Sequence, residues 1–307
     1  MRGANAGVAA VVCVALVCLA MIACQPKKAE PVRLDPSLEA MAPPDTVFVV
    51  GANLDAIRGT VVYQKLLSRV PLPQLDEFTK QTGLDPRKDL SQILSCTNGK
   101  HGLLMARGKF NVADLEARLK EKGAKSFDYK NHKLYGTEQA VIVFWNDSTA
   151  VAGTADEVRA LVDRGGKGGL PQALKDLVKT MPANDQIFAA LTGGLSAINP
   201  NVPPNSNLAN IVNALRTIDT ATIGMDLSKG FDLDAEVTCK TERDAKFVHD
   251  MVKGIVGIGR LNTPDSHPEL LKLYDAIQVT QQQAHAKVAA SIPTDLADKF
   301  LDLWLKR

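Results

Sequence analysis

Beyond about residue 44, apolar and polar residues follow two different periodic patterns. In several short stretches they alternate at every second position, a pattern that indicates a half-buried β-strand. The clearest is 231–239, where Phe231, Leu233, Ala235 and Val237 alternate with Asp232, Asp234, Glu236 and Thr238. Elsewhere apolar residues recur every three or four positions, which indicates amphipathic helices. The pattern therefore predicts an α+β fold.

Turn residues join most of the predicted strands as hairpins. Asn98 and Gly99 separate the apolar runs 93–97 and 102–106, and this dipeptide is a strong hairpin signal. Four further hairpins are predicted, with turns at 131–132, 146–148, 229–230 and 282–283. Hairpins connect neighbouring antiparallel strands, so we expect antiparallel sheets.

Helices are predicted between these strands from capping residues as well as from spacing. Thr154 to Glu157 reads as a capping box, and Gly123 stands where a glycine ends a helix begun after Asn111. The predicted helical stretches are 54–66, 75–83, 112–122, 154–162, 208–215, 242–255 and 295–306, and a loop and helix are expected at 261–274.

The order of elements occurs twice. A strand at 47–50 and another at 187–191 each end near glycine, and each is followed by helix, hairpin, helix, hairpin and helix. We interpret this as two similar tandem units, 44–168 and 169–307, each an antiparallel sheet with helices packed on one face. The alternative is that this order recurs by chance.

The first 23 residues differ from the rest of the chain. Arg2 is the only charge before Lys27, and residues 8–23 are all apolar. A positive start, a short apolar run and small residues before a cut site are typical of an export signal. The run falls just short of the about 17–25 residues of a membrane-spanning helix. An uncleaved anchor or an ordinary signal peptide cut nearby are the alternatives.

The end of this run carries a more specific motif. The tetrapeptide Met21–Cys24 (Met, Ile, Ala, Cys) resembles the lipobox of bacterial lipoproteins cleaved by the type II signal peptidase, with Met in place of the usual Leu. The resemblance implies lipidation of Cys24, with diacylglyceryl and often palmitate-like chains anchoring the protein to a membrane. Gln25, rather than Asp, implies sorting to the outer membrane, with the folded body in the periplasm or at the cell surface.

The next segment, 24–43, is rich in proline and charge and has no apolar period. We expect a tether that holds the body clear of the lipid surface. The mature body resembles uncharacterised two-unit secreted α+β proteins, a likeness that assigns no site.

Charge and cysteine usage exclude some functions. The formal net charge is +2, and it falls to +1 when Arg2 is removed with the signal. This balance does not suggest a nucleic-acid binder. After processing only Cys96 and Cys239 remain, both in apolar strand-like contexts. They are either two buried thiols or one disulfide in an oxidising compartment.

No candidate catalytic, metal or cofactor site emerges. The five histidines, at positions 101, 132, 249, 267 and 285, lack ligand spacing. Ser196 follows a strand as in a nucleophile elbow, but the last glycine of that motif is missing, so we interpret it as a hydroxyl at a helix start.

Two glycine-rich runs have structural interpretations. The run Gly165–Gly169 lies between two helices, which is wrong for a phosphate loop, and we interpret it as a flexible junction between the units. The run Gly254–Gly259 would let the chain leave a helix or pack closely. Trp145 and Trp304 lie in apolar stretches and are expected to pack in the core.

These patterns leave three hypotheses open. The first is a non-enzymatic envelope lipoprotein that binds or scaffolds an unknown envelope protein. The second is a carrier of a lipid or other apolar ligand, since antiparallel sheets with helices on one face can enclose a cavity. The third is a hydrolase with a cryptic site. A large apolar cavity would favour the carrier, and a cleft with converging polar groups would favour the enzyme.

Overall fold

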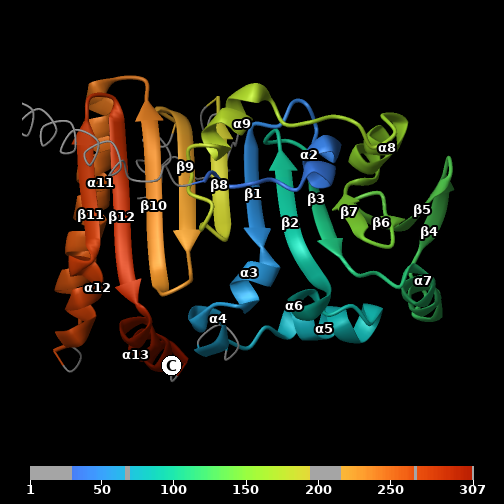
Figure 1. Cartoon of the computed structure of the whole chain (residues 1–307), viewed down its shortest axis with the longest axis horizontal. Helices are drawn as coiled ribbons and strands as arrows, with labels where there is room; N and C mark the ends of the chain where they lie inside the picture. Colours follow the sequence, from blue (N-terminus) through green and yellow to red (C-terminus); the bar gives the residue numbers. More distant parts are fainter. Residues whose placement is uncertain (1–29, 66–69, 194–215, 266–267, 306–307) are drawn as a thin grey trace, which may run out of the picture. The chain divides into compact units, whose positions relative to one another are not determined.

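We describe residues 30–65, 70–193, 216–265 and 268–305 of a computed structural model of the chain. Residues 31–307 form one compact unit. Its centre is a single 12-stranded sheet with the order β11-β12-β10-β9-β8-β1-β2-β3-β7-β6-β5-β4 (Figure 1). Every pairing in it is antiparallel.

The strands agree closely with the predicted hairpins. They are β1 (Phe48–Asn53), β2 (Leu90–Thr97), β3 (Gly102–Gly108), β4 (Ser126–Tyr129), β5 (His132–Thr137), β6 (Ala140–Asn146), β7 (Thr149–Gly153), β8 (Ile187–Thr192), β9 (Ile218–Asp226), β10 (Gly230–Cys239), β11 (Ile277–Gln282) and β12 (His285–Pro293). All five predicted hairpins, the extra one at β4–β5 included, are confirmed.

Most of the predicted helical stretches agree with helices of the structure within two residues at each end, with the exceptions of 54–66 and 242–255. The helices are α2 (Pro36–Met41), α3 (Leu54–Arg58), α4 (Val61–Lys65), α5 (Pro73–Thr82), α6 (Pro86–Asp89), α7 (Val112–Glu121), α8 (Ala155–Asp163), α9 (Gln172–Val178), α11 (Glu242–Leu261), α12 (Leu271–Asp275) and α13 (Thr294–Leu305), with a 3-10 turn at Pro268–Leu270. The predicted helix 54–66 is divided at Gly59 into α3 and α4. The predicted helix 208–215 lies outside the described residues.

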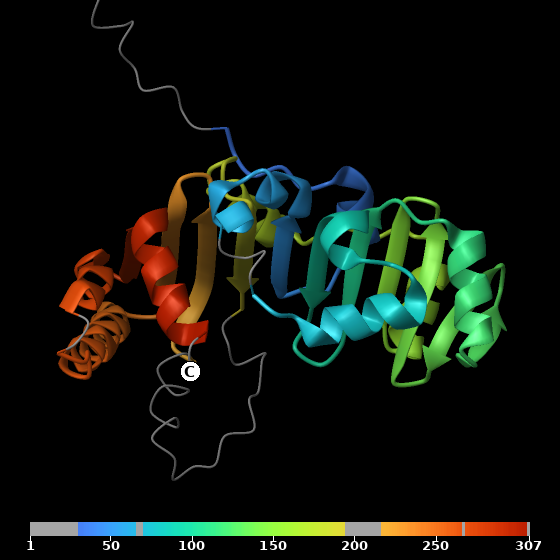
Figure 2. The same cartoon turned by 90° about the horizontal axis from the view of Figure 1, so that it is seen from below.

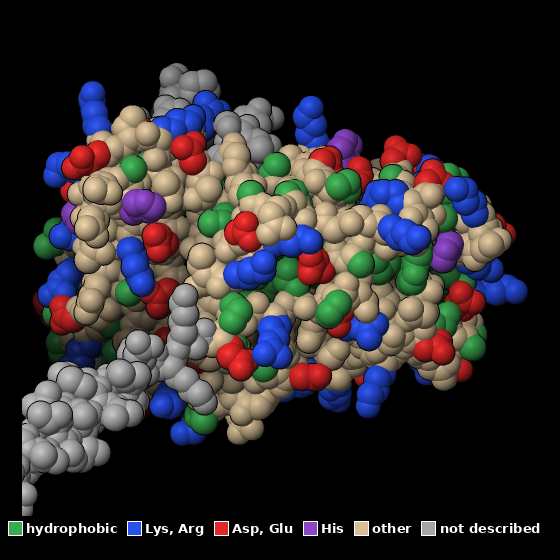
Figure 3. Space-filling model, turned by 45° about the horizontal axis from the view of Figure 1, so that its top comes forward, with side chains coloured by type: hydrophobic (Ala, Val, Ile, Leu, Met, Phe, Trp, Pro, Cys, Tyr) green, Lys and Arg blue, Asp and Glu red, His purple; other side chains and the backbone are tan. Residues whose placement is uncertain are grey.

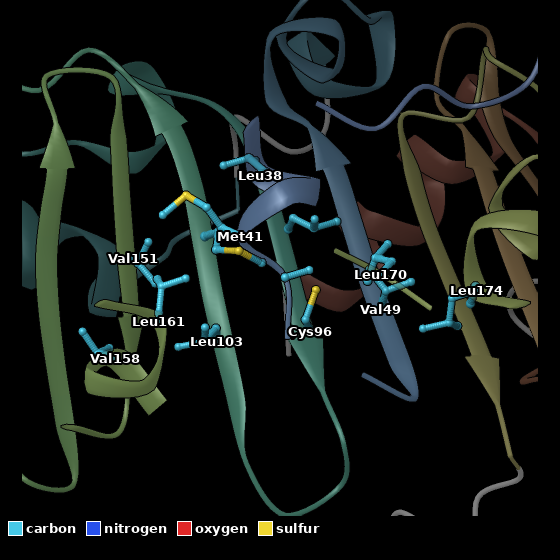
Figure 4. Packing of buried hydrophobic residues seen from close by; sticks show 14 of the residues in the cluster. Leu38, Met41, Val49, Cys96, Leu103, Val151, Val158, Leu161, Leu170 and Leu174 are labelled. Carbon is cyan, nitrogen blue, oxygen red and sulfur yellow. The ribbon is translucent and has the colours of Figure 1, made fainter. Parts of the chain in front are cut away.

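One face of the sheet, which we call the core face, carries the main hydrophobic core. Val49, Cys96 and Leu103 are register neighbours on it, across β1, β2 and β3. The helices α2, α8 and α9 cover this face, and Leu38 and Leu161 from two of them are almost completely buried against it (Figure 4). This packing supplies most of the apolar burial in the first half of the chain.

The opposite face, which we call the pocket face, is also covered by helices. Its side chains on β2 and β3 include Ile93, Leu104 and Ala106; α5 lies over this part of the sheet, and α7 packs beside α5 towards β4 (Figure 2). The expectation of helices on one face is therefore wrong. Strand β3 carries apolar side chains in both directions, Leu103 and Met105 on one side and Leu104 and Ala106 on the other, so both faces require cover.

In the second half, the described helices α11 and α13 cover the strands β10 to β12 on the pocket face. Ala245 and Val248 of α11 pack against Val237 and Ala286 there. On the core face the same strands carry a polar surface, in which Lys287 lies 2.7 Å from Asp234. Strand β10 therefore has one apolar and one polar, solvent-facing side, as the alternation in 231–239 predicts.

The segment 24–43 is not a free tether throughout. From Pro31 onward it belongs to the folded body, because the amide of Val32 donates to the carbonyl of Met181 at 2.9 Å and α2 inserts Leu38 and Met41 into the core. Asp35 caps this helix with its side chain, and Pro36 follows at the first turn. That cap followed by proline is a helix-start signal which the overall proline content concealed.

The glycine run at 165–169 is packed rather than a flexible junction. The amide of Gly169 donates to the carbonyl of Ala42 at 2.9 Å, and Gly166 lies against the Trp145 ring. Trp145 also stacks on His132 with ring centroids 4.4 Å apart, so its predicted packing role is confirmed. The side chain of Trp304 lies outside the described residues.

The second glycine run does not end its helix. Helix α11 continues through it to Leu261, six residues beyond the predicted end at residue 255. The Tyr274 ring lies so close to Gly259 that no side chain would fit there. The predicted role in close packing is therefore confirmed at Gly259.

Candidate apolar pocket

A pocket of about 620 Å³ lies between the pocket face and the helices that cover it. Its floor comes from alternate residues of four adjacent strands. The register pairs Ile93 with Ala106, Leu104 with Ala152, and Phe144 with Ala150. Because side chains on one face of a sheet lie side by side, these residues form a continuous apolar floor.

The pocket's roof comes from helices and loops that follow β1 and β3. Leu75 and Phe78 of α5 are three positions apart, so they lie on the same side of that helix. Leu115 and Leu119 of α7 are four apart and do the same. The end near α3 and α6 is lined by Leu54, Ile57, Tyr63, Leu84, Pro86 and Leu90.

Local sequence explains why α5 and α7 take these positions. Helix α5 begins at Pro73 and ends at Gly83, which has φ = 79° and so adopts the left-handed conformation that glycine tolerates. The side chain of Arg118 from α7 occupies the space beside Gly83 where a Cβ would project. The absence of a side chain at Gly83 therefore allows α7 to approach the end of α5.

Small floor residues leave the space unfilled. Ala106, Ala150 and Ala152 lie beneath two helices, yet they remain only partly buried. Protein interiors are normally packed to crystal-like density, so partly exposed alanines under a helical roof indicate a vacancy that the protein's own side chains do not occupy. Leu104 of the floor is 45% exposed, as expected for an apolar side chain that borders an empty pocket.

Among the described residues that line the pocket, two arginines are charged, and both are compensated. The guanidinium of Arg58 donates to the carbonyls of Arg87 and Leu90 at 3.0 and 2.9 Å and pairs with Asp55. The guanidinium of Arg87 pairs with Asp85 and Asp76, each at 2.8 Å.

The contact between Arg87 and Asp85 shifts the pKa values of both groups. The hydrogen bond from Arg87 holds the pKa of Asp85 below its usual range, and the same contact raises the pKa of Arg87. Both groups therefore remain charged and paired at neutral pH. Neither arginine presents an unpaired charge to the pocket interior.

The two mature cysteines lie away from this pocket. Both are buried free thiols. Cys96 on β2 and Cys239 on β10 are separated by β1, β8 and β9, or about 19 Å at roughly 4.8 Å per strand, which is too far for a disulfide. The alternative of a bridge is therefore excluded. Burial raises the pKa of Cys96 to about 12, so this thiol is unreactive at neutral pH.

An unusual carboxylate lies on the core face of the second half. The side chain of Asp185 lies over Gly224, and its Oδ2 is buried without a hydrogen-bond partner. Burial first, and then the nearby charges of Asp226 and Asp234, raise the pKa of Asp185 to about 6. An ionised carboxylate buried without a hydrogen-bond partner costs stability.

The other sequence-level candidates do not converge. Cys24 and Ser196 lie outside the described residues. His101, His132, His249 and His285 lie on separate elements, and within the described part of the chain no three metal-binding side chains gather. No described helix is long and apolar enough to cross a membrane.

Sequence reasoning did not locate the pocket. The available signal was the alanine at alternate positions of β7, Ala150 and Ala152, together with Ala106 of β3. Alanine at such positions cannot fill the space below a covering helix. Alanines on separate strands indicate a pocket only when the strand register is known to place them side by side.

Comparison with known proteins identifies a fold but no family. No family model and no curated protein matches the chain. Among solved structures, crystal form III of TP0453 is 7% identical over 87% of this chain and 97% of that one, with a TM-score of 0.50. Crystal form I is 6% identical over 91% and 99%, with a TM-score of 0.45. The likeness to crystal form III supports a mixed α+β fold built on a large antiparallel sheet.

Proposed function

We propose that this protein binds an apolar small molecule in the pocket between β2, β3, β6 and β7 and the helices α5 and α7, as a carrier and not as an enzyme. The observation that carries this proposal is the volume of about 620 Å³ enclosed almost entirely by apolar side chains. Ligand sites are typically concave, largely apolar and about 300–1,000 Å³ in volume. A hydrolase would instead require converging polar groups near a nucleophile.

A pocket-filling variant tests this function. Ala106→Leu combined with Ala152→Leu places two larger side chains in the existing space, and Ala289→Leu on the core face of β12 is the matched control. Binding of the fluorescent probe N-phenyl-1-naphthylamine is measured by titration. We expect saturable binding to the wild type and the control, and at least tenfold weaker binding to the filled variant.

Two results would count against the carrier function. The first is equal binding by all three proteins, which would place the probe elsewhere. The second is the absence of binding to a wild type that circular dichroism shows to be folded.

A second function is favoured by an exposed apolar stripe on α11. Phe247, Ile255, Ile258 and Leu261 are 51%, 53%, 61% and 87% exposed. Contiguous exposed apolar side chains are typical of protein interaction sites. An envelope protein with an apolar docking surface is the partner that this stripe fits. Replacing Ile255 and Ile258 by Asn should abolish cross-linking to that partner and leave probe binding intact.

We also propose that the chain is an exported lipoprotein anchored through Cys24 in the cell envelope, with the body in the periplasm or at the cell surface. The support is the lipobox-like tetrapeptide Met21–Cys24 and the apolar run before it. Acyl chains on Cys24 would keep a carrier beside a source of apolar ligand.

The strand order further supports a tandem duplication of one α+β unit. From the central β1–β8 pair outward, the order is β1, β2, β3, β7, β6 in one direction and β8, β9, β10, β12, β11 in the other. Each strand of the second series is the counterpart that the sequence pattern assigns to the first. We propose that the two units share one sheet, with their first strands paired, and that the boundary near residue 168 separates them in sequence.

A further inference from the structure

Resting on the proposed function, we infer that the pocket takes the single hydrocarbon chain of an amphiphile and leaves its head group in solvent, so that binding depends on chain length and not on head charge. The size of the pocket, the pairing of its charged lining residues and the balanced net charge of the chain support this inference.

The size of the pocket fits one chain. An engineered protein cavity of about 150 Å³ binds benzene, which corresponds to roughly 25 Å³ per carbon atom. On that scale the volume of about 620 Å³ holds roughly 25 carbons. One acyl chain of 16 to 18 carbons fits with room to spare. Two such chains exceed the volume, so a single-chain lipid fits better than a two-chain lipid.

The charges of the lining do not provide a head-group site. A carboxylate or phosphate would be held by an arginine with free donors. Here Arg58 uses its guanidinium on two main-chain carbonyls and Asp55, and Arg87 uses its own on Asp85 and Asp76. An anion approaching either arginine would meet the paired carboxylates as well, so its net attraction is small.

The remaining polar side chains do not provide one either. The hydroxyl of Thr82 donates to the carbonyl of Phe78 at 2.8 Å and accepts from the amide of Leu84 at 3.1 Å. Gln74 lines the pocket from the exposed side of α5. Tyr63 adds one hydroxyl to the described lining, and the other lining residues are apolar, so the interior favours hydrocarbon.

The outer surface is consistent with a head group of either charge. On the core face, which lies on the other side of the sheet from the pocket, lysine, arginine, aspartate and glutamate are interspersed without a field of one sign (Figure 3). The formal net charge of the whole chain is only +2. Long-range attraction therefore favours neither anionic nor cationic amphiphiles.

The test compares ligands that share a chain and differ in the head. Dodecanoate, dodecan-1-ol and dodecyltrimethylammonium are titrated against bound N-phenyl-1-naphthylamine at concentrations below micelle formation. We expect their Kd values to agree within about threefold. A second series of carboxylates with 8, 10, 12 and 14 carbons should bind about tenfold more tightly for each two methylenes added.

Ionic strength provides the matched control. Raising the sodium chloride concentration by about tenfold screens charge and should change the Kd of dodecanoate by less than about twofold. Dodecanoate binding more than tenfold tighter than dodecan-1-ol, and weakened to the level of the alcohol by the added salt, would overturn the inference and leave the carrier function intact. A flat response to chain length would also overturn it. Failure of every ligand and of the probe to bind a folded protein would overturn the carrier function itself.

Discussion

At the scale of single residues, three alanines leave the pocket open. Two arginines at its edge are paired, so they do not select a ligand by the charge of its head group. Ala106, Ala150 and Ala152 leave the volume open, and the carboxylate partners of Arg58 and Arg87 cancel the charge at its edge. None of these residues belongs to a sequence motif. Their identities were in the sequence, but their proximity depends on the register of four strands, and only the fold supplies that register.

Asp185 supports a prediction about pH. Its pKa of about 6 in the folded protein lies above the ordinary value of 3.8, so folding favours the protonated form. This contribution to stability is fully present below pH 4 and is lost as the pH rises through 6. Asp185→Asn removes the ionisation and keeps the shape. We expect the variant to be more stable than the wild type at pH 8 by about 1 kcal/mol, discounted because the site is partly open to water.

Denaturant unfolding of both proteins at pH 4 and pH 8 measures this effect. The difference between them should shrink towards pH 4, where Asp185 is protonated in the folded wild type. A variant that is less stable by the same amount at both pH values would show that the carboxylate makes a favourable contact instead.

At the scale of elements, local signals predicted strands and hairpins well but missed the role of α2. Hairpins are set by adjacent residues, such as Asn98 and Gly99 at the β2–β3 turn, and so they are readable from sequence. Helix α2 has only six residues among several prolines, and its stability comes from the tertiary contacts of Leu38 and Met41. A short helix of this kind has little stability of its own, so its pattern alone is weak.

Leu38→Ala tests whether α2 is part of the folded body. Leu38 is 1% exposed, and truncating a buried leucine typically costs about 2–5 kcal/mol of the free energy of unfolding. The neighbouring exposed Ser37→Ala is the control and should change stability by less than about 0.5 kcal/mol. Equal stability of the two variants in chemical denaturation would restore the interpretation of this segment as a tether.

At the scale of the whole molecule, the sequence predicted the α+β class and the antiparallel pairing but not the placement of helices on both faces. Periodicity reports which positions are apolar, not which helix covers them. Strand β3, with apolar residues in both directions, already required two layers of cover in the first half. In the second half the acidic side chains of β10 make the core face polar and solvent-exposed. The two halves therefore share a strand order but differ in which face the helices cover.

The lipid anchor is a prediction for the whole chain in the cell. Cys24→Ala removes the thiol that the lipobox resemblance marks for acylation. In a bacterial host that processes lipoproteins, we expect the wild type in the membrane fraction with palmitate label and the variant without label and released from that fraction. Retention of unlabelled Cys24→Ala in the membrane would contradict anchoring through this residue.

The location of a bound chain tests the central claim most directly. A dodecanoate analogue with a photoreactive diazirine at its terminal carbon is bound to the protein and irradiated, and the labelled peptides are identified by mass spectrometry. We predict adducts in β3, β7 and α5, around Leu104, Ala152 and Phe78, and their loss from the Ala106→Leu, Ala152→Leu protein. Adducts confined to the α11 stripe around Ile255 and Ile258, unchanged in the filled protein, would contradict the account.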